Sequence, residues 1–180
     1  MDKNPFMAGG FVWTGFDYRG EPTPYGWPCI NSHFGIMDMC GFPKDNFYYY
    51  KAWWGNDPVL HLFPHWNWEE RDGETIKVWV HSNLDEVELF LNGKSQGSKK
   101  VEPLKHLEWG VKYEPGVLEA RGSKSGKVVL SEKRETTGKP ASIAVVKPAG
   151  AHVATRSAAI ALADWLVYFA TTRRRFSSQV

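Results

Sequence analysis

The sequence predicts a mainly β protein that contains a small antiparallel β-sandwich, and three observations support this fold class. First, apolar and polar residues alternate at every second position in segments between residues 75 and 135, which is the period of a half-buried strand. Second, short turns separate these segments, among them Asn92-Gly93 and Pro115-Gly116. Third, the segments contain no long pattern of helical period. Strands with this length and spacing are typical of a sandwich.

The N-terminal part of the chain predicts one short strand, a long loop and one helix. Residues 11–13 are an apolar run that predicts a buried strand, and glycines and prolines interrupt the chain directly after it. We therefore expect residues 14–47 to form an ordered loop with short turns. Asp45 is suited to the N-cap of a helix that runs through Trp53, and Gly55 is suited to its end.

Residues 56–68 connect this helix to the predicted sandwich. Residues 56–64 contain two prolines and predict an extended linker. Trp66 and Trp68 would lie on the same side of an extended strand, because side chains alternate in direction along a strand. Two indoles on one face could form a platform for a sugar or pack against a neighbouring domain, and we favour packing.

The alternating segments define the strands of the sandwich. In residues 75–81 and 86–91 the apolar side chains that share one face are Ile76, Val78 and Val80, followed by Val87, Leu89 and Leu91. Asn92-Gly93 predicts a tight turn into a strand over residues 94–100, because both residues tolerate positive φ. Further strands are expected over residues 107–113, 117–122 and 127–135, with a turn at residues 123–126.

The last part of the chain is harder to interpret from its pattern. Gly138-Lys139-Pro140 predicts a boundary, so we expect three regions, residues 1–57, 58–140 and 141–180. Residues 157–170 predict a short helix that falls short of the roughly 20 residues needed to span a bilayer. We expect residues 150–180 to be poorly ordered, or held by contacts with another chain.

Composition excludes several classes of function. Hydrophobic residues at 42% and charged residues at 23% are globular values, and a net charge of +2 gives no reason to expect nucleic acid or a membrane as a partner. Cys29 and Cys40 are too few for a disulfide framework and are expected as free thiols. The histidines have no compact ligand spacing, so we expect no metal and no cofactor; they are His61, His65, His81 and His106. Aromatic residues reach 14%, which indicates a large aromatic core, an aromatic sugar-binding surface, or both.

Several segments together carry a family resemblance. They are Phe11–Pro24, Trp27-Pro28, Ser32–Ile36, Gly41–Asp45 and Tyr48–Trp54. In this order they resemble the end of the catalytic barrel of glycoside hydrolase family 2, and most of all its bacterial β-galactosidases. Residues 61–140 resemble the immunoglobulin-like domain that follows the barrel in that family. The resemblance therefore implies an immunoglobulin-like β-sandwich preceded by the terminal strand, loop and helix of a (β/α)8 barrel.

The resemblance also implies what the chain lacks. The 180 residues are too few for a whole barrel, which needs about 250. Retaining glycosidases use two carboxylates about 5 Å apart. In this family both glutamates come from earlier barrel strands, the first in an Asn-Glu pair, and this sequence contains no such pair. We therefore expect a C-terminal piece of a β-galactosidase that has no catalytic residue of its own and whose parent is periplasmic or extracellular.

The resemblance suggests which residues contact a sugar. Trp13 is expected to stack on the sugar, and Asn31 to reach its 6-hydroxyl end, although another register would put Ser32 there. Asp17 and Arg19 could orient the substrate or could join Glu21 in an ion-pair network that holds the loop. We expect Asp17 and Glu21 not to be a catalytic pair, because one loop cannot control both sides of a glycosidic bond.

The expected partners follow from this interpretation. They are a β-galactoside or related saccharide bound by the intact parent, and a second copy of the chain through the aromatic surface of the barrel remnant. The alternative function is a non-catalytic module, in which the sandwich either binds carbohydrate or only supports other domains. Exposed coplanar tryptophans would favour binding and buried ones would favour support; the candidates are Trp66, Trp68, Trp79 and Trp109.

Overall fold

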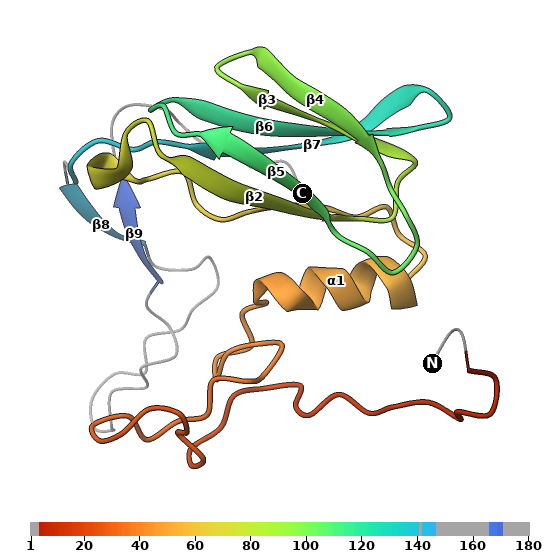
Figure 1. Cartoon of the computed structure of the whole chain (residues 1–180). Helices are drawn as coiled ribbons and strands as arrows, with labels where there is room; N and C mark the ends of the chain where they lie inside the picture. The colour runs from red at the N-terminus through yellow and green to blue at the C-terminus, as the bar shows by residue number, and fades with distance from the viewer. Residues whose placement is uncertain (1–3, 141, 147–165, 171–180) are drawn as a thin grey trace. The chain divides into compact units, whose positions relative to one another are not determined.

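The computed structural model describes residues 4–140, 142–146 and 166–170, with side chains up to residue 140. The chain divides into two compact units, Met1–Glu135 and Thr136–Val180, which are described separately. The first unit contains a loop region, one α-helix and a β-sandwich (Figure 1). Within the described residues, no helix is long and apolar enough to cross a bilayer.

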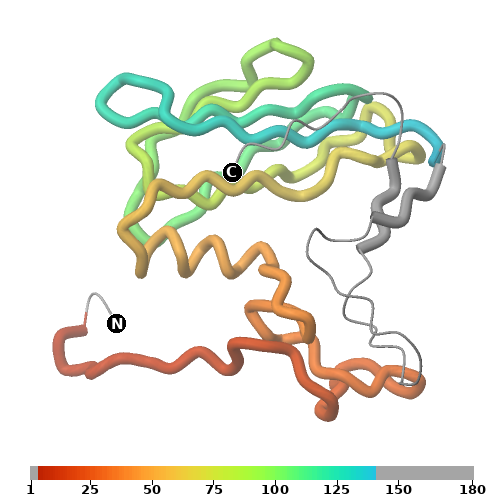
Figure 2. Tube along the Cα trace, turned by 180° about the vertical axis from the view of Figure 1, so that it is seen from behind, coloured from red at the N-terminus to blue at the C-terminus, as the bar shows by residue number. Residues whose placement is uncertain are grey.

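The sandwich consists of two antiparallel sheets. One has the order β1 (Leu60–Phe63), β2 (Thr75–Ser82) and β5 (Leu107–Lys112). The other has the order β4 (Lys94–Lys100), β3 (Glu86–Leu91), β6 (Val117–Lys124) and β7 (Lys127–Glu135). The two layers and the β3–β4 and β6–β7 hairpins can be followed from behind in Figure 2. The predicted antiparallel sandwich is confirmed.

The core lies between the two sheets, and the alternation in the sequence identified its residues. Ile76, Val78 and Val80 from β2 face the core, as do the alternate residues of β3, which are Val87, Leu89 and Leu91. Tyr113 and Leu118 complete it from the second half of the chain and are fully buried. Each fully buried aliphatic side chain contributes roughly 1.5–3 kcal/mol, so this core is the main source of stability in the unit.

The predicted turn after β3 is tied to a second turn. Asn92 and Gly93 have φ angles of 49° and 79°, as a tight hairpin turn requires. The Asn92 side chain accepts a hydrogen bond from the Val117 amide at 2.8 Å and donates to the Pro115 carbonyl at 3.1 Å. A Cβ on Gly116 would lie 1.8 Å from the Asn92 amide oxygen, so only glycine fits there.

Two predictions between the helix and the sandwich were wrong. Residues 60–63 form strand β1 instead of a linker, pairing with β2 from Leu60↔Ser82 to Phe63↔Trp79. Residues 66–68 are not a strand and precede a 3-10 helix, η1 (Glu69–Arg71). Trp66 is fully buried and its indole nitrogen donates to the Glu114 carbonyl at 3.1 Å. Burial in the core, which a local pattern does not reveal, explains this tryptophan.

Helix α1 (Asp45–Trp54) packs on the outer face of β1 and β2 (Figure 1). Lys44, not Asp45, is the N-cap, and the Asp45 carboxylate instead contacts the His61 ring at 2.8 Å. Tyr48 stacks on His61 with ring centroids 3.8 Å apart. Tyr49 also packs on the sandwich, edge-on against His81 with ring centroids 5.4 Å apart. Gly55 ends the helix as predicted, with its amide donating to the Lys51 carbonyl.

The short strand expected over residues 11–13 does not occur. Phe11 is fully exposed and Trp13 is 75% exposed. A strand requires a partner for its amides and carbonyls, and within the described residues the first backbone bond to a distant segment is at Thr14, whose carbonyl accepts from the Ile36 amide.

The second unit contains one described pair of strands. β8 (Ser142–Val146) pairs with β9 (Leu166–Ala170) in antiparallel register. β9 corrects the expected helix over its last five residues, which pair with β8 from Ser142↔Ala170 to Val146↔Leu166. The rest of that predicted helix, residues 157–165, lies outside the described residues, as does most of the segment 150–180 that we expected to be poorly ordered.

Candidate functional site

Residues 14–44 form a loop that doubles back on itself and is pinned by backbone bridges (Figure 2). The bridges are Phe16↔Met37, Arg19↔Asn31 and Met37↔Pro43. The Asp17 amide donates to the Met37 carbonyl at 3.0 Å, and the Lys44 amide donates to the Ile36 carbonyl at 3.0 Å. The loop is therefore ordered without belonging to a sheet, as predicted.

One glycine permits the closest approach in this loop. A Cβ on Gly35 would lie 2.3 Å from the Asp17 amide nitrogen and 2.6 Å from the Met37 carbonyl oxygen. The Gly35 amide also donates to the Asp17 carboxylate at 2.8 Å. Any side chain at this position would have to push the two halves of the loop apart.

The Asp17 carboxylate fixes the base of the loop. The Lys44 ammonium lies 2.6 Å from it and also donates to the His33 carbonyl at 3.0 Å. The hydrogen bond from Lys44 holds the pKa of Asp17 below its usual value, in spite of partial burial and with further help from the Gly35 amide. Asp17 is thus an ionised anchor and is poorly suited to act as a general acid.

Arg19 does not form the predicted ion-pair network. It is exposed, and in the described part of the chain its guanidinium has no ion pair with Asp17 or Glu21. Lys44 takes the position that we had assigned to an arginine. Lys44 lies in one of the segments that carry the family resemblance. Its distance in sequence from Asp17 gave no indication that the two side chains form an ion pair.

Trp13, Tyr18 and Glu21 form a connected polar and aromatic group. The Trp13 indole nitrogen donates to the Tyr18 hydroxyl at 3.4 Å, and that hydroxyl donates to the Glu21 carboxylate. The carboxylate raises the pKa of Tyr18, because ionising the phenol would break the bond. Glu21 has a φ of 46°, a left-handed conformation that is uncommon for a residue with a Cβ and is found more often at functional sites.

A shallow hollow of about 460 Å³ lies beside this group. It is lined by Trp13, Glu21, Thr23 and Phe34. Tyr18 packs edge-on against Phe34, with ring centroids 5.7 Å apart, and so holds the second aromatic wall. Aromatic walls with a hydroxyl and a carboxylate between them match the two kinds of surface on a sugar ring, its apolar C–H face and its hydroxyl rim.

The two residues considered for the sugar contact in the next turn differ in their hydrogen bonds. Ser32 is buried, and its hydroxyl oxygen accepts from the Tyr18 amide at 3.0 Å, so it serves the loop itself. The Asn31 side-chain oxygen is buried, has no hydrogen-bond donor among the described residues, and Asn31 is not among the residues that line the hollow. An unpaired buried acceptor is costly, so a shift of the loop that exposed this oxygen to a donor would be favourable.

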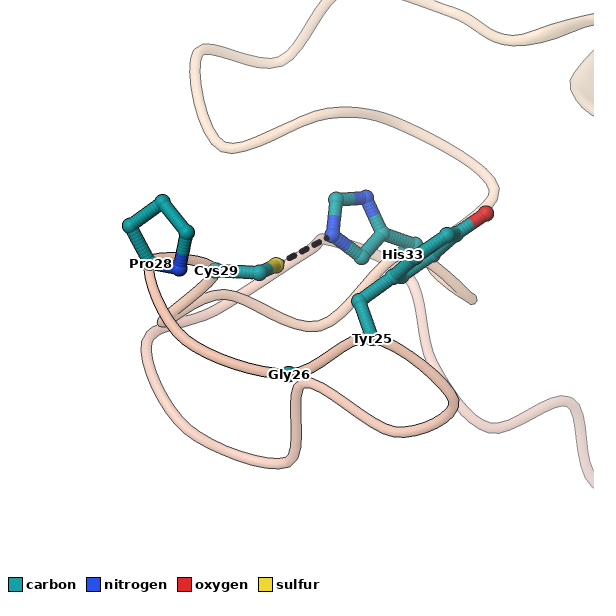
Figure 3. Close-up of a pocket in the computed structure, with 5 residues that line it drawn as sticks. All are labelled: Tyr25, Gly26, Pro28, Cys29 and His33. Atoms are coloured by element: carbon teal, nitrogen blue, oxygen red, sulfur yellow. Dashed lines mark hydrogen bonds between the residues drawn. The ribbon is translucent and has the colours of Figure 1, made fainter.

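A second hollow, of about 530 Å³, lies on the same loop and was not anticipated. Its lining residues are Tyr25, Gly26, Pro28, Cys29 and His33 (Figure 3). The Cys29 sulfur faces the His33 ring, with 2.9 Å between Sγ and Nε2. In the sequence Cys29 and His33 are four residues apart, and this spacing predicts no contact unless the path of the loop is known.

The tryptophans of the sandwich do not form an exposed platform. Trp66 and Trp109 are buried, and Trp68 and Trp79 are half-buried. Trp79 stacks on His106 with ring centroids 4.2 Å apart. Among the residues whose placement is described, no three His, Cys, Asp or Glu side chains gather in a way that could hold a metal ion.

Comparisons with known proteins find similar sequences over most of the chain. Residues 73–130, the body of the sandwich, match a family described as a domain of unknown function (DUF4982). Over 142 residues the chain is 54% identical to the β-galactosidase BoGH2A of Bacteroides ovatus, which covers 78% of this chain and 16% of that protein. A β-glucuronidase of Bacteroides fragilis is 30% identical over 134 residues, covering 73% of this chain and 19% of that protein.

Solved structures give the same result for the fold. A β-glycosidase from Bacteroides vulgatus superposes with a TM-score of 0.68 at 41% identity, over 74% of this chain and 17% of that chain. A glycosyl hydrolase family 2 member from Bacteroides cellulosilyticus superposes with a TM-score of 0.68 at 28% identity, over 75% of this chain and 22% of that chain. The chain thus spans less than a quarter of the length of these relatives, and over that span it belongs to glycoside hydrolase family 2.

Proposed function

We propose that this chain contributes part of the sugar pocket of a retaining β-galactosidase and a sandwich that supports it, while the catalytic glutamates come from a part of the parent protein that these residues do not include. The observation that carries this proposal is the hollow lined by Trp13, Phe34, Glu21 and Thr23, which combines two aromatic side chains with a carboxylate and a hydroxyl. The name of the relative that is 54% identical supports the choice of galactosides.

The charge of the hollow supports a neutral sugar over a uronic acid. Relatives of this chain include β-glucuronidases, whose substrates by name carry a carboxylate. The charged residue that lines the hollow is Glu21, and its described lining includes no Lys or Arg. A sugar carboxylate placed beside the Glu21 carboxylate would be repelled, whereas a hydroxymethyl group would not.

Each predicted contact residue has a distinct role in this proposal. Trp13 stacks on the sugar, and Asn31 accepts a hydrogen bond from a sugar hydroxyl through its unpaired side-chain oxygen. Arg19, exposed at the edge of the loop, orients the substrate. Asp17 acts indirectly, because its bonds to Lys44 and Gly35 fix the loop that carries the other residues.

The aromatic surface before the helix needs a partner in this proposal. Large apolar side chains in this part are exposed, including Phe11, Trp13, Phe16, Trp27 and Phe42. So many exposed aromatic residues are typical of a surface that another protein segment covers. We infer that the rest of the barrel covers it in the parent and that a second copy of the chain covers it in isolation.

A binding experiment with two matched sugars tests the proposal. Saturation-transfer NMR would compare a non-hydrolysable β-thiogalactoside with the corresponding β-thioglucuronide on the 180-residue chain. We expect weak binding of the galactoside, weaker binding of the glucuronide, and a loss of about tenfold in Trp13→Ala, as expected for one aromatic stacking contact. Trp27→Ala is the control, because Trp27 is also highly exposed, at 87% against 75% for Trp13, and lines neither hollow.

Two results would overturn the proposal. Preferred binding of the glucuronide would contradict the choice of galactosides. Hydrolysis of a chromogenic β-galactoside by this chain, abolished in Glu21→Gln, would show that the loop carries its own catalytic carboxylate. The expected result in that assay is no turnover by either protein.

A further inference from the structure

The second hollow contains a thiol and an imidazole in direct contact. Cys29 Sγ lies 2.9 Å from His33 Nε2 and 3.5 Å from the Asn31 carbonyl oxygen. Cys29 is half-buried and His33 is exposed, so the pair can be reached from solvent through the hollow. Figure 3 shows the sulfur directed at the imidazole, with the Tyr25 ring on the opposite side of the histidine.

The surrounding loop holds this pair in position. The Tyr25 ring packs edge-on against the His33 imidazole, with centroids 4.8 Å apart. The Lys44 ammonium donates to the His33 carbonyl at 3.0 Å, which fixes the backbone of the histidine. The Cys29 amide donates to the Gly26 carbonyl at 3.0 Å and closes the turn that carries the cysteine. Both partners are therefore positioned independently of their mutual contact.

This arrangement has the parts of an activated nucleophile. A base within hydrogen-bond reach of a thiol can take its proton as the sulfur attacks, and a third group that orients the base completes the pattern. Here His33 Nε2 is the base and the Tyr25 ring orients it. Cys40 provides an internal contrast, because it is an exposed free thiol with no imidazole partner among the residues described.

We propose that Cys29 and His33 form a thiol-exchange site for small disulfides with an apolar or aromatic group. In the reaction, Cys29 Sγ attacks one sulfur of the disulfide as its proton passes to His33 Nε2. A new S–S bond forms on Cys29, the old S–S bond breaks, and the released thiolate takes the proton from His33. The apolar lining of Tyr25 and Pro28 accommodates the group that stays attached. The reaction replaces one S–S bond with another, so it needs no oxidant besides the disulfide itself.

The site is separate from the proposed sugar pocket. The two hollows share no lining residue, so the exchange reaction does not depend on sugar binding or on the parent's hydrolase activity. The proposal would stand if the sugar hypothesis failed, and the reverse is also true.

The experiment compares the two cysteines of the chain one at a time. Cys40→Ser leaves only Cys29 and Cys29→Ser leaves only Cys40, and each is treated with dithiodipyridine while release of thiopyridone is followed by absorbance. We expect Cys29 to react at least about tenfold faster than Cys40, which is a modest effect for a positioned general base. Mass spectrometry would confirm which cysteine carries the mixed disulfide.

Substitution of the base provides the decisive comparison. We expect His33→Gln to slow Cys29 by at least about fivefold and to leave Cys40 unchanged, because only Cys29 contacts the imidazole. If His33→Gln merely loosened the loop, the half-buried Cys29 would become more accessible and react faster, which is the opposite sign. A Cys29 rate no higher than that of Cys40, or a His33→Gln effect that is equal for both thiols, would overturn the proposal.

Discussion

Tryptophans are used in opposite ways by the sandwich and by the loop that precedes it. In the sandwich Trp66 is fully buried and Trp109, a residue of β5, is buried. Each indole nitrogen donates a hydrogen bond to a backbone carbonyl. In the loop Trp13 and Trp27 are exposed, and the loop is held by backbone bridges and an ion pair instead of a core. The sandwich therefore owes its stability to burial, whereas the loop keeps its aromatic residues accessible by using polar anchors.

The largest expected effect follows from removing a core tryptophan. Trp66→Ala should cost about 3–5 kcal/mol of unfolding free energy, because it deletes a fully buried indole from the centre of the sandwich. Trp13→Ala, on the exposed loop, should change stability by less than about 0.5 kcal/mol. Urea unfolding followed by circular dichroism would measure both. Equal losses would show that the loop and the sandwich share one core.

Acid should destabilise the sandwich through a buried histidine. Burial lowers the pKa of His81 to about 4, and the nearby His61 and His106 add to the shift while Asp45 opposes it. Both ring nitrogens of His81 are buried without a partner in the described part of the chain. Because the folded protein binds this proton less readily than the unfolded chain, stability is fully present above pH 6.5 and falls as the pH drops towards 4.

The size of this acid effect can be measured directly. A shift from 6.5 to about 4 corresponds to a loss of roughly 2–3 kcal/mol across that pH range. Replacing the imidazole in His81→Leu should remove most of this dependence, as measured by thermal unfolding at a series of pH values. An unchanged slope between pH 6.5 and 4 would assign the effect to other groups.

An added methyl group should destabilise the loop at one glycine and leave its stability unchanged at another. Gly35→Ala places a Cβ against the Asp17 amide and should destabilise the closed loop by roughly 1–3 kcal/mol without unfolding the sandwich. Gly26→Ala is the matched control, because a Cβ there meets no atom within 4 Å. Hydrogen exchange of residues 14–44 would report the opening. Equal exchange in the two variants would contradict the close approach at Gly35.

The smallest expected effect concerns the ion pair at the base of the loop. Lys44→Met should weaken the loop by less than about 1 kcal/mol, because the lysine is partly exposed even though Asp17 is nearly buried. Lys77→Met removes the more exposed pair with Glu108 and should have no measurable effect. The same exchange experiment would rank the two variants. A larger effect of Lys77→Met would contradict the expectation that the more buried ion pair contributes more to stability.

The two regions also differ in how far the sequence could predict them. In β2 and β3 every second residue is apolar, so local alternation identified the strands and their core faces. Strand β1 was missed because the prolines on either side of it, Pro58 and Pro64, suggested a linker, and its pairing with β2 is a contact between distant parts of the chain. Trp66 was expected to pack against a neighbouring domain, because only the folded sandwich brings Glu114 and Tyr113 beside it.

In the loop the sequence indicated the kind of site more readily than its contacts. Trp13 was a candidate for contact with a sugar, and it lines one hollow together with Glu21, which was expected only in an ion-pair network. The pairing of Asp17 with Lys44, the orphaned oxygen of Asn31 and the contact of Cys29 with His33 all depend on the path of an irregular backbone. Such a path has no periodic signature, so these contacts were beyond prediction.

The hydrogen bond from the Leu62 amide to the Glu132 carboxylate hinders pairing of an edge strand with another molecule. β1 lies at the edge of its sheet, where free amides invite pairing with a strand from another molecule. The Leu62 amide is instead occupied by the Glu132 carboxylate of β7 at 2.8 Å. At another edge, β4 carries three lysines, Lys94, Lys99 and Lys100, which repel an incoming strand of the same kind. The loop thus displays exposed aromatic residues, whereas in the sandwich the edge strands β1 and β4 carry features that hinder pairing with a strand from another molecule.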